Sequence, residues 1–228
     1  MYRQSLSERV EIGCVINFSL MALAARQFTI LTCGVSQSGK STFARKVAQQ
    51  TGADVLCKDV FYSELGVRKL PAPETLRAKA ERQILVQAKK KVASGLSVII
   101  DAALLEKERR QRYLSELAFF NETICLVAFS DPGLLKAASR VARKKVRYKL
   151  FGDPVNLACT FEAYRFSRSR FQVIDDDEIR RLTRWAQVII AGPERKRAIR
   201  YFREDGNLRW DWLTGPKFEH CIIRALRV

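Results

Sequence analysis

The segment Gly34-Val35-Ser36-Gln37-Ser38-Gly39-Lys40-Ser41 matches the pattern G-x-x-x-x-G-K-[ST] at every fixed position. Gly34 and Gly39 can adopt backbone angles that other residues avoid, so a loop here can curl around an anion with its N–H groups pointing inward. Lys40 would then bridge the β- and γ-phosphates of a nucleotide, and the hydroxyl of Ser41 would bind magnesium. The residues expected to bind the nucleotide are Gly34, Ser36, Gln37, Ser38, Gly39, Lys40, Ser41 and Thr42.

The residues on either side of this loop predict the elements that must position it. An apolar run at residues 28–33 is typical of a buried parallel strand. A helix is expected to begin near Lys40, to place Phe43 and Val47 on one apolar face, and to end at Gly52. The amino end of such a helix adds its dipole and unpaired amides to an anion site. This order of strand, loop and helix favours nucleotide binding over a chance match in a glycine-bearing turn.

The rest of the chain alternates apolar runs with helical patterns, which predicts a parallel α/β sheet of five strands. Further strands are expected at residues 53–57, 97–100, 123–130 and 187–191, and helices at 74–94, 105–119, from 131 onward, 161–171 and 175–185. Residues 62–73 are expected to form a loop. Residues 198–213, with Asp205-Gly206 at their centre, predict a β-hairpin, and residues 218–228 are a candidate for another strand.

Carboxylates follow three of the predicted strands, at the edge where open α/β sheets bind ligands. Asp59 lies where it can meet an acceptor; its alternative interpretation is a loop carboxylate or helix cap. Asp101 directly follows the third strand, where it would hold magnesium through water or fix the acceptor, and its alternative is a cap for the next helix. Asp131 precedes Pro132 and is interpreted as a helix cap with proline in the first turn.

Positive charge is the main feature of the composition. The net charge is +17 and the isoelectric point is about 10, which indicates an anionic partner such as nucleic acid, a phosphorylated metabolite or an acidic surface, or else a general solubility charge. The helix expected after Asp131 carries many basic residues and no acid, so it forms either a solvated basic face or a mobile lid over phosphates.

Aromatic residues accompany the basic ones in two places. Residues 161–171 alternate aromatic side chains with arginines, which would either stack on bases or form a helix with a core face. The tail after Pro193 is basic and aromatic, and it forms either an appended binding surface or a sheet extension that buries its tryptophans. The predicted organisation is an N-terminal extension at 1–26, a nucleotide-binding P-loop domain at 27–192 and an appendage at 193–228.

The remaining composition sets bounds on the class of protein. The cysteines at positions 14, 33, 57, 125, 159 and 221 show no paired spacing, and a single histidine, His220, makes a zinc site unexpected. Reduced, buried cysteines favour a cytoplasmic protein. The apolar residues 12–25 are too short and too interrupted to span a membrane; they form an extra helix, or else Met21 is the true start. The pattern indicates no particular oligomeric state.

Three segments together resemble one group of P-loop kinases, the group that includes polynucleotide 5′-hydroxyl kinase and zeta-toxin-like kinases. They are GVSQSGKSTFAR at 34–45, CKD at 57–59 and VIIDAALLEKERR at 98–110. The resemblance covers about residues 27–191. It implies a three-layer P-loop kinase fold with a five-stranded parallel sheet and a helical lid, to which the C-terminal hairpin is added.

The same resemblance implies roles for particular residues. Lys40 and Ser41 would hold ATP and Mg²⁺, Asp101 would be a second metal ligand, and Asp59 would be the general base for the acceptor hydroxyl. The lid arginine would be Arg140 or Arg143, and Lys144 could also serve. The chain departs from the family at Tyr62, three residues after Asp59, where an arginine is often present; Lys58 or Arg68 could replace it.

The expected function is transfer of the ATP γ-phosphoryl group to a hydroxyl, with a nucleic-acid 5′-hydroxyl as the leading acceptor. The charge excess favours nucleic acid. The alternatives are a kinase of a small molecule (a nucleoside, sugar or metabolite) and a non-catalytic ATP-binding module. A hydrolase would need a water-positioning residue, which the pattern does not identify.

Overall fold

The computed structural model describes residues 27–68, 70–120, 123–151, 160–191, 197–214 and 222–223. The expectations for residues 1–26, with the alternative start at Met21, lie outside the described residues, as do those for His220 and for Cys14, Cys159 and Cys221. Of the candidate strand at 218–228, only Ile222 and Ile223 are described, and they are helical and buried, so a strand is wrong at these positions.

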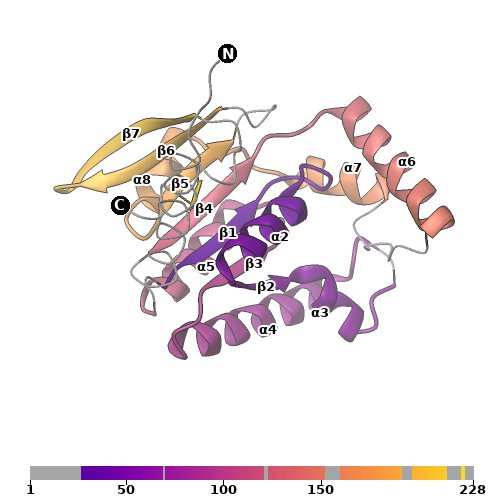
Figure 1. The fold of residues 1–228 in the computed structure, drawn as a ribbon, viewed down its shortest axis with the longest axis horizontal. Helices are drawn as coiled ribbons and strands as arrows, with labels where there is room; N and C mark the ends of the chain where they lie inside the picture. Colours follow the sequence, from indigo (N-terminus) through magenta and orange to yellow (C-terminus); the bar gives the residue numbers. More distant parts are fainter. Residues whose placement is uncertain are drawn as a thin grey trace, which may run out of the picture.

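The described residues form one mixed sheet of seven strands, in the order β2-β3-β1-β4-β5-β6-β7 (Figure 1). The first five strands are parallel, as expected from the sequence, and the last two are antiparallel. In chain order the strands are β1 (Thr29–Cys33), β2 (Asp54–Cys57), β3 (Val98–Asp101), β4 (Ile124–Phe129), β5 (Gln187–Ala191), β6 (Arg197–Glu204) and β7 (Asn207–Thr214).

Helices cover both faces of this sheet, which confirms the three-layer α/β fold. One face packs against α4, α5 and α8 through residues such as Ile84, Leu114 and Ile179, and the other packs against α2 through Phe43 and Val47. The helices are α2 (Lys40–Thr51), α3 (Lys58–Glu64), α4 (Glu74–Ala93), α5 (Lys107–Ala118), α6 (Leu134–Phe151), α7 (Phe161–Arg170) and α8 (Asp176–Leu182).

The central strands are apolar throughout because both of their faces are covered. Every residue of β1, β3 and β4 is buried. Since the five parallel strands run in one direction, their carboxyl ends lie at one edge of the sheet. Helices α6 and α7 lie at one end of the molecule and the β6–β7 hairpin at the other (Figure 1).

Two local expectations need correction. Residues 58–64 form α3 directly after β2, so Tyr62 is buried in a helix rather than exposed in a loop. The helix after β4 begins at Leu134, so Pro132 precedes it and Asp131 is not its cap. The Asp131 carboxylate instead accepts hydrogen bonds from the Gly133 amide (2.9 Å) and the Tyr164 hydroxyl (2.9 Å), which keeps its role structural.

The C-terminal hairpin extends the main sheet, because β6 pairs with β5 along Val188–Ala191. Asp205 and Gly206 have positive φ angles of 50° and 78°, as a tight hairpin turn between twisted strands requires. Ala198 and Leu213 pack on the core, but Trp210 and Trp212 are 61% and 55% exposed. The expectation that a sheet extension would bury its tryptophans is therefore wrong for these two. The division of the chain at residue 192 stays a prediction.

The aromatic and basic segment at 161–171 forms α7, and the core-face interpretation holds for part of it. Tyr164 is fully buried and packs with Val35 and Ala137, while Arg165 is exposed. None of the described helices combines the length and the apolar character needed to cross a membrane.

Candidate functional site

The glycine loop joins β1 to α2 and is held between the ends of neighbouring strands. Gly34 has a φ of 133°, and a Cβ at this position would lie 2.6 Å from the carbonyl oxygen of Phe129 at the end of β4. The Gly34 amide donates to the Ala103 carbonyl (2.8 Å), just beyond β3. Only glycine fits this close approach, so the first glycine of the pattern fixes where the loop leaves the sheet.

The Lys40 ammonium lies inside the loop and is 8% exposed. It donates to the carbonyl oxygens of Gly34 (2.9 Å) and Val35 (2.7 Å) and to the hydroxyl of Ser38 (3.3 Å). Burial lowers the pKa of Lys40, while the nearby Asp101 carboxylate acts in the opposite direction. The loop therefore holds a partly desolvated positive charge beside the cavity that the next residues line.

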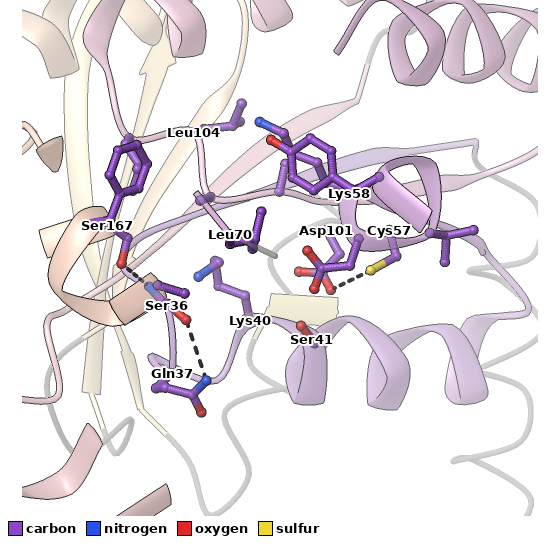
Figure 2. Close-up of a pocket in the computed structure, with 18 of the residues that line it drawn as sticks. Ser36, Gln37, Lys40, Ser41, Cys57, Lys58, Leu70, Asp101, Leu104 and Ser167 are labelled. Carbon is purple, nitrogen blue, oxygen red and sulfur yellow. Dashed lines mark hydrogen bonds between the residues drawn. The ribbon is translucent and has the colours of Figure 1, made fainter. Parts of the chain in front are cut away.

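A cavity of about 1230 Å³ opens at the carboxyl edge of the parallel strands. Figure 2 shows the side chains of Lys40, Ser41 and Asp101 on its wall. Most of the predicted site residues line this one cavity: Ser36, Gln37, Gly39, Lys40, Ser41, Thr42, Asp59, Asp101, Arg140 and Arg143. Gly34 and Ser38 shape the loop without lining the cavity.

Asp101 ends β3 and is 6% exposed. Its carboxylate accepts from the Thr32 hydroxyl (3.5 Å) and from the Cys57 thiol (Sγ–Oδ2 3.7 Å). Burial, with the Asp101 and Asp59 charges, raises the pKa of Cys57 to about 12, so the thiol stays a neutral donor. The hydroxyl of Ser41 and the carboxylate of Asp101 are oxygen ligands of the kind Mg²⁺ prefers. The described residues contain no cluster of three or more metal-ligating side chains.

Asp59 lies in the first turn of α3 and lines the cavity, half-buried. Its neighbour Lys58 pairs with Glu81 on α4 (2.6 Å), and Arg68 is exposed and does not line the cavity. Arg68 is therefore outside the cavity, whereas Lys58 lines it beside Asp59 and stays a candidate for the role of the missing arginine. Burial raises the pKa of Tyr62, so this phenol stays protonated at neutral pH.

Helices α6 and α7 approach the loop through two hydrogen bonds to its main chain. The Arg140 guanidinium donates to the Gln37 carbonyl oxygen, and the Ser36 amide donates to the Ser167 hydroxyl (2.8 Å). Arg143 and Lys144 line the cavity on the same helix as Arg140. The basic helix expected to act as a lid thus contacts the loop through Arg140, and four of its cations, Arg140, Arg143, Lys144 and Lys145, line the cavity.

Sequence reasoning missed part of the cavity wall, namely Arg77 and Glu81 on α4. Arg109 on α5 and Phe166 on α7 line the same cavity. The spacing of residues 77 and 81, one helical turn apart, could have placed both on one face.

The three arginines clustered at the start of α5 have three separate environments. Arg109 lines the cavity and Arg110 is fully buried against Glu178. Arg112 is exposed and pairs with Glu116 one turn along the helix. Their proximity in the sequence therefore did not indicate a shared role.

Comparison with known proteins gives a family for more than half of the chain. The family model AAA_33, described as an AAA domain, matches residues 29–155, from β1 into the segment that follows α6. No curated protein matches the sequence significantly.

Solved structures with similar folds include Kti12 from Chaetomium thermophilum in complex with ADP-AlF3, at 17% identity and a TM-score of 0.50 over 72% of this chain and 88% of that one. A sugar kinase from Janibacter sp. HTCC2649 is 19% identical, with a TM-score of 0.47 over 74% and 88% of the chains. The Pnkp1/Rnl/Hen1 RNA repair complex is 18% identical, with a TM-score of 0.45 over 64% and 47%. None of these singles out the polynucleotide kinase group.

Proposed function

Because the chain belongs to the AAA_33 family of AAA domains, we propose that it is an ATP-dependent kinase that transfers the γ-phosphoryl group to an acceptor hydroxyl. One observation carries this proposal. The phosphate-binding loop with Lys40 and the carboxylate of Asp59 line the same cavity, from different elements of the carboxyl edge. A nucleotide and an acceptor could therefore meet there.

The loop end of the cavity suits the triphosphate. Lys40 and the amides at the start of α2 would bind the phosphate oxygens. Ser41 and Asp101 are the residues that would hold Mg²⁺, which when bound would neutralise charge on those oxygens. Arg140 is held by the Gln37 carbonyl, so we assign it to positioning α6, and Arg143 and Lys144 to neutralising the transferred group.

Phosphoryl transfer asks little covalent chemistry of the protein, so positioning and charge neutralisation supply most of the rate. Asp59 would accept or orient the proton of the attacking hydroxyl. Its place at the start of α3, fixed by the β2–α3 junction, holds the carboxylate at the edge of the sheet.

Two acceptor classes are supported by different observations. The net charge of +17 supports a nucleic-acid 5′-hydroxyl. The acceptor end of the cavity supports a smaller molecule, because the carboxylate residues Asp59, Glu81 and Glu106 line it as well as the cations Lys58, Arg77 and Arg109, so it carries little net charge.

The test is phosphoryl transfer from labelled ATP to a panel of 5′-hydroxyl oligonucleotides, nucleosides and sugars. We expect one class to be labelled. The Asp59→Asn variant should lower turnover by about 100-fold or more while ATP binding is unchanged, because only the proton acceptor is lost. Glu64→Gln, an exposed change on the same helix, should leave turnover as it is.

Two results would contradict the proposal. Unchanged turnover in Asp59→Asn would remove this residue from the base role. ATP binding without transfer to any acceptor would instead select a non-catalytic nucleotide-binding module.

A further inference from the structure

Three arginines gather at the acceptor end of the cavity, and the proposed reaction leaves them without a role. Arg77 comes from α4, Arg109 from α5 and Arg170 from α7. Two of them contact the Phe166 ring, whose centroid is 5.3 Å from the Arg77 guanidinium and 5.7 Å from that of Arg170. Arg77, Arg109 and Phe166 line the cavity.

Arg109 is the best neutralised of the three. Its guanidinium pairs with Glu74 (NH2–Oε1 2.7 Å), with Glu106 (Nε–Oε2 2.6 Å) and with Glu81. Every nitrogen of its fork therefore has a carboxylate partner. Arg109 is suited to hold α4 and α5 together rather than to bind a further anion.

Arg77 differs from Arg109 in its partners. Its NH2 group pairs with Glu74, a side chain that is 57% exposed and is shared with Arg109. Its own side chain is 12% exposed, and its Nε is buried without a hydrogen-bond acceptor among the described residues. Burial and the charges of Arg170 and Arg109 lower the pKa of Arg77. The guanidinium of Arg77 is thus mostly removed from water, has one N–H donor without an acceptor, and lies near other positive charges. The protein alone compensates poorly for the free-energy cost of this arrangement.

Arg77 is placed to act together with Asp59. Both line the same cavity, which Tyr62 also lines. An acceptor with its hydroxyl at Asp59 could therefore extend past Tyr62 to the guanidinium of Arg77.

We propose that Arg77 binds an anionic group of the acceptor, a phosphate or a carboxylate, while the acceptor hydroxyl lies at Asp59. The planar guanidinium fits the oxygens of either group. This inference rests on the proposed kinase function, and it narrows the acceptor to a hydroxyl compound with a negative charge of its own. The phosphodiester of a nucleic acid and the phosphate or carboxylate of a metabolite share this chemistry.

The test is binding, so that it does not depend on turnover. Isothermal titration would compare matched probes in the presence of Mg²⁺ and a non-hydrolysable ATP analogue: thymidine 3′-phosphate with thymidine, glucose 6-phosphate with glucose, and glycerate with glycerol. We expect the anionic member of at least one pair to bind about tenfold more tightly or better, as a charged hydrogen-bonded contact provides. A preference within the thymidine pair would indicate nucleic acid as the acceptor, and a preference within the glucose or glycerol pair would indicate a metabolite.

The variant Arg77→Gln should lose this preference, to less than about threefold, and Arg77→Lys should retain part of it because the charge remains. Arg82→Gln, an exposed change on the same helix, should keep the full preference. Thermal denaturation of each variant shows whether the fold is intact.

The proposal is overturned if the wild-type protein binds no anionic probe more tightly than its neutral partner. It is equally overturned if folded Arg77→Gln keeps the preference, which would leave Arg77 as a structural partner of Glu74 and Phe166. Loss of the preference in Arg77→Gln, with no phosphoryl transfer by the wild-type protein, would support the anion site and contradict the kinase function.

Discussion

Lys40 carries a positive charge into a nearly closed part of the loop. Carbonyl oxygens and a hydroxyl replace its hydration, but burial still lowers its pKa. Because the folded pKa lies below the unfolded one, the buried charge costs folding free energy at neutral pH. This cost disappears as the pH rises through the folded pKa toward the unfolded value of about 10.4.

Nucleotide affinity should show the same titration. The triphosphate needs the ammonium form of Lys40, so affinity should fall as the pH rises through its lowered pKa, before an ordinary lysine would titrate. Isothermal titration with a non-hydrolysable ATP analogue between about pH 7 and pH 10 measures this. The Lys40→Met variant should bind weakly and lack this fall, and Lys46→Met, on the same helix, should behave like the wild-type protein. A constant wild-type affinity across the range would contradict the role of Lys40.

Among single residues, the sequence could predict those that belong to a short continuous pattern. Gly34, Lys40 and Ser41 belong to one short pattern, and Asp101 directly follows an apolar strand. Arg77 could not be found in this way, because its position in the cavity depends on how α4 packs against α5 and α7. Tyr62 was misplaced because α3 is a single short helix with little periodicity of its own.

Among the elements, α5 and α8 are joined by a buried ion pair. The Arg110 guanidinium, which has no exposed surface, donates to both carboxylate oxygens of Glu178 (2.6 and 2.8 Å). It also donates to the carbonyl oxygens of Leu104 and Leu105 (3.0 Å each) and of Gln172 (2.9 Å). The Arg110 side chain therefore joins the cavity wall after β3 to α8 and to the segment that precedes α8.

Arg110→Met should lower the free energy of unfolding by about 3–5 kcal/mol, because it leaves the Glu178 carboxylate buried without its partner. Urea denaturation followed by circular dichroism measures this. Arg112→Met, two residues along, should change stability by less than about 1 kcal/mol, since its pair with Glu116 is exposed. Equal stabilities of the two variants would contradict the assigned difference.

Most elements could be predicted because their apolar periodicity is long and regular. The strands β1, β3 and β4 and the helix α4 are examples, and their ends differ from the expected ones by at most one residue. The start of α6 was wrong because Asp131-Pro132 has the composition of a helix start. The Asp131 carboxylate instead bonds to Tyr164, thirty-three residues away, which the sequence does not reveal.

On the scale of the whole molecule, positive charge is distributed unevenly around the cavity. The loop end carries Lys40, Arg140, Arg143, Lys144 and Lys145 with Asp101 as its carboxylate, whereas the acceptor end is balanced. Among the described residues, further exposed cations lie outside the cavity, for example Arg203 and Arg209 of the hairpin. A long anionic acceptor would meet this outer charge, and a small one would not.

Salt should therefore separate the two acceptor classes. With an oligonucleotide acceptor we expect the KM to rise by more than about tenfold between about 50 and 200 mM salt, because bound cations are released from several phosphates. Thymidine 3′-phosphate in the same assay should change far less. An oligonucleotide KM that does not respond to salt would exclude an extended nucleic-acid contact and favour a small metabolite.

The order of the strands in the sheet is the part of the architecture that local sequence patterns do not predict. Alternating strands and helices predicted five parallel strands, and the hairpin was recognised by its Asp-Gly turn. That β1 lies between β3 and β4 depends on long-range packing, as does the exposure of Trp210 and Trp212.

The two links between the loop and helices α6 and α7 end on the amide of Ser36 and the carbonyl of Gln37. Neither link uses a side chain of the loop, so exchanging the residues between its two glycines would leave both in place. Both hydrogen bonds depend instead on the path of the loop's main chain. This path is unusual at Gln37, where φ is 64°. A bound ligand that changes this main-chain path would therefore alter the contacts of both helices, α6 and α7, at the same time.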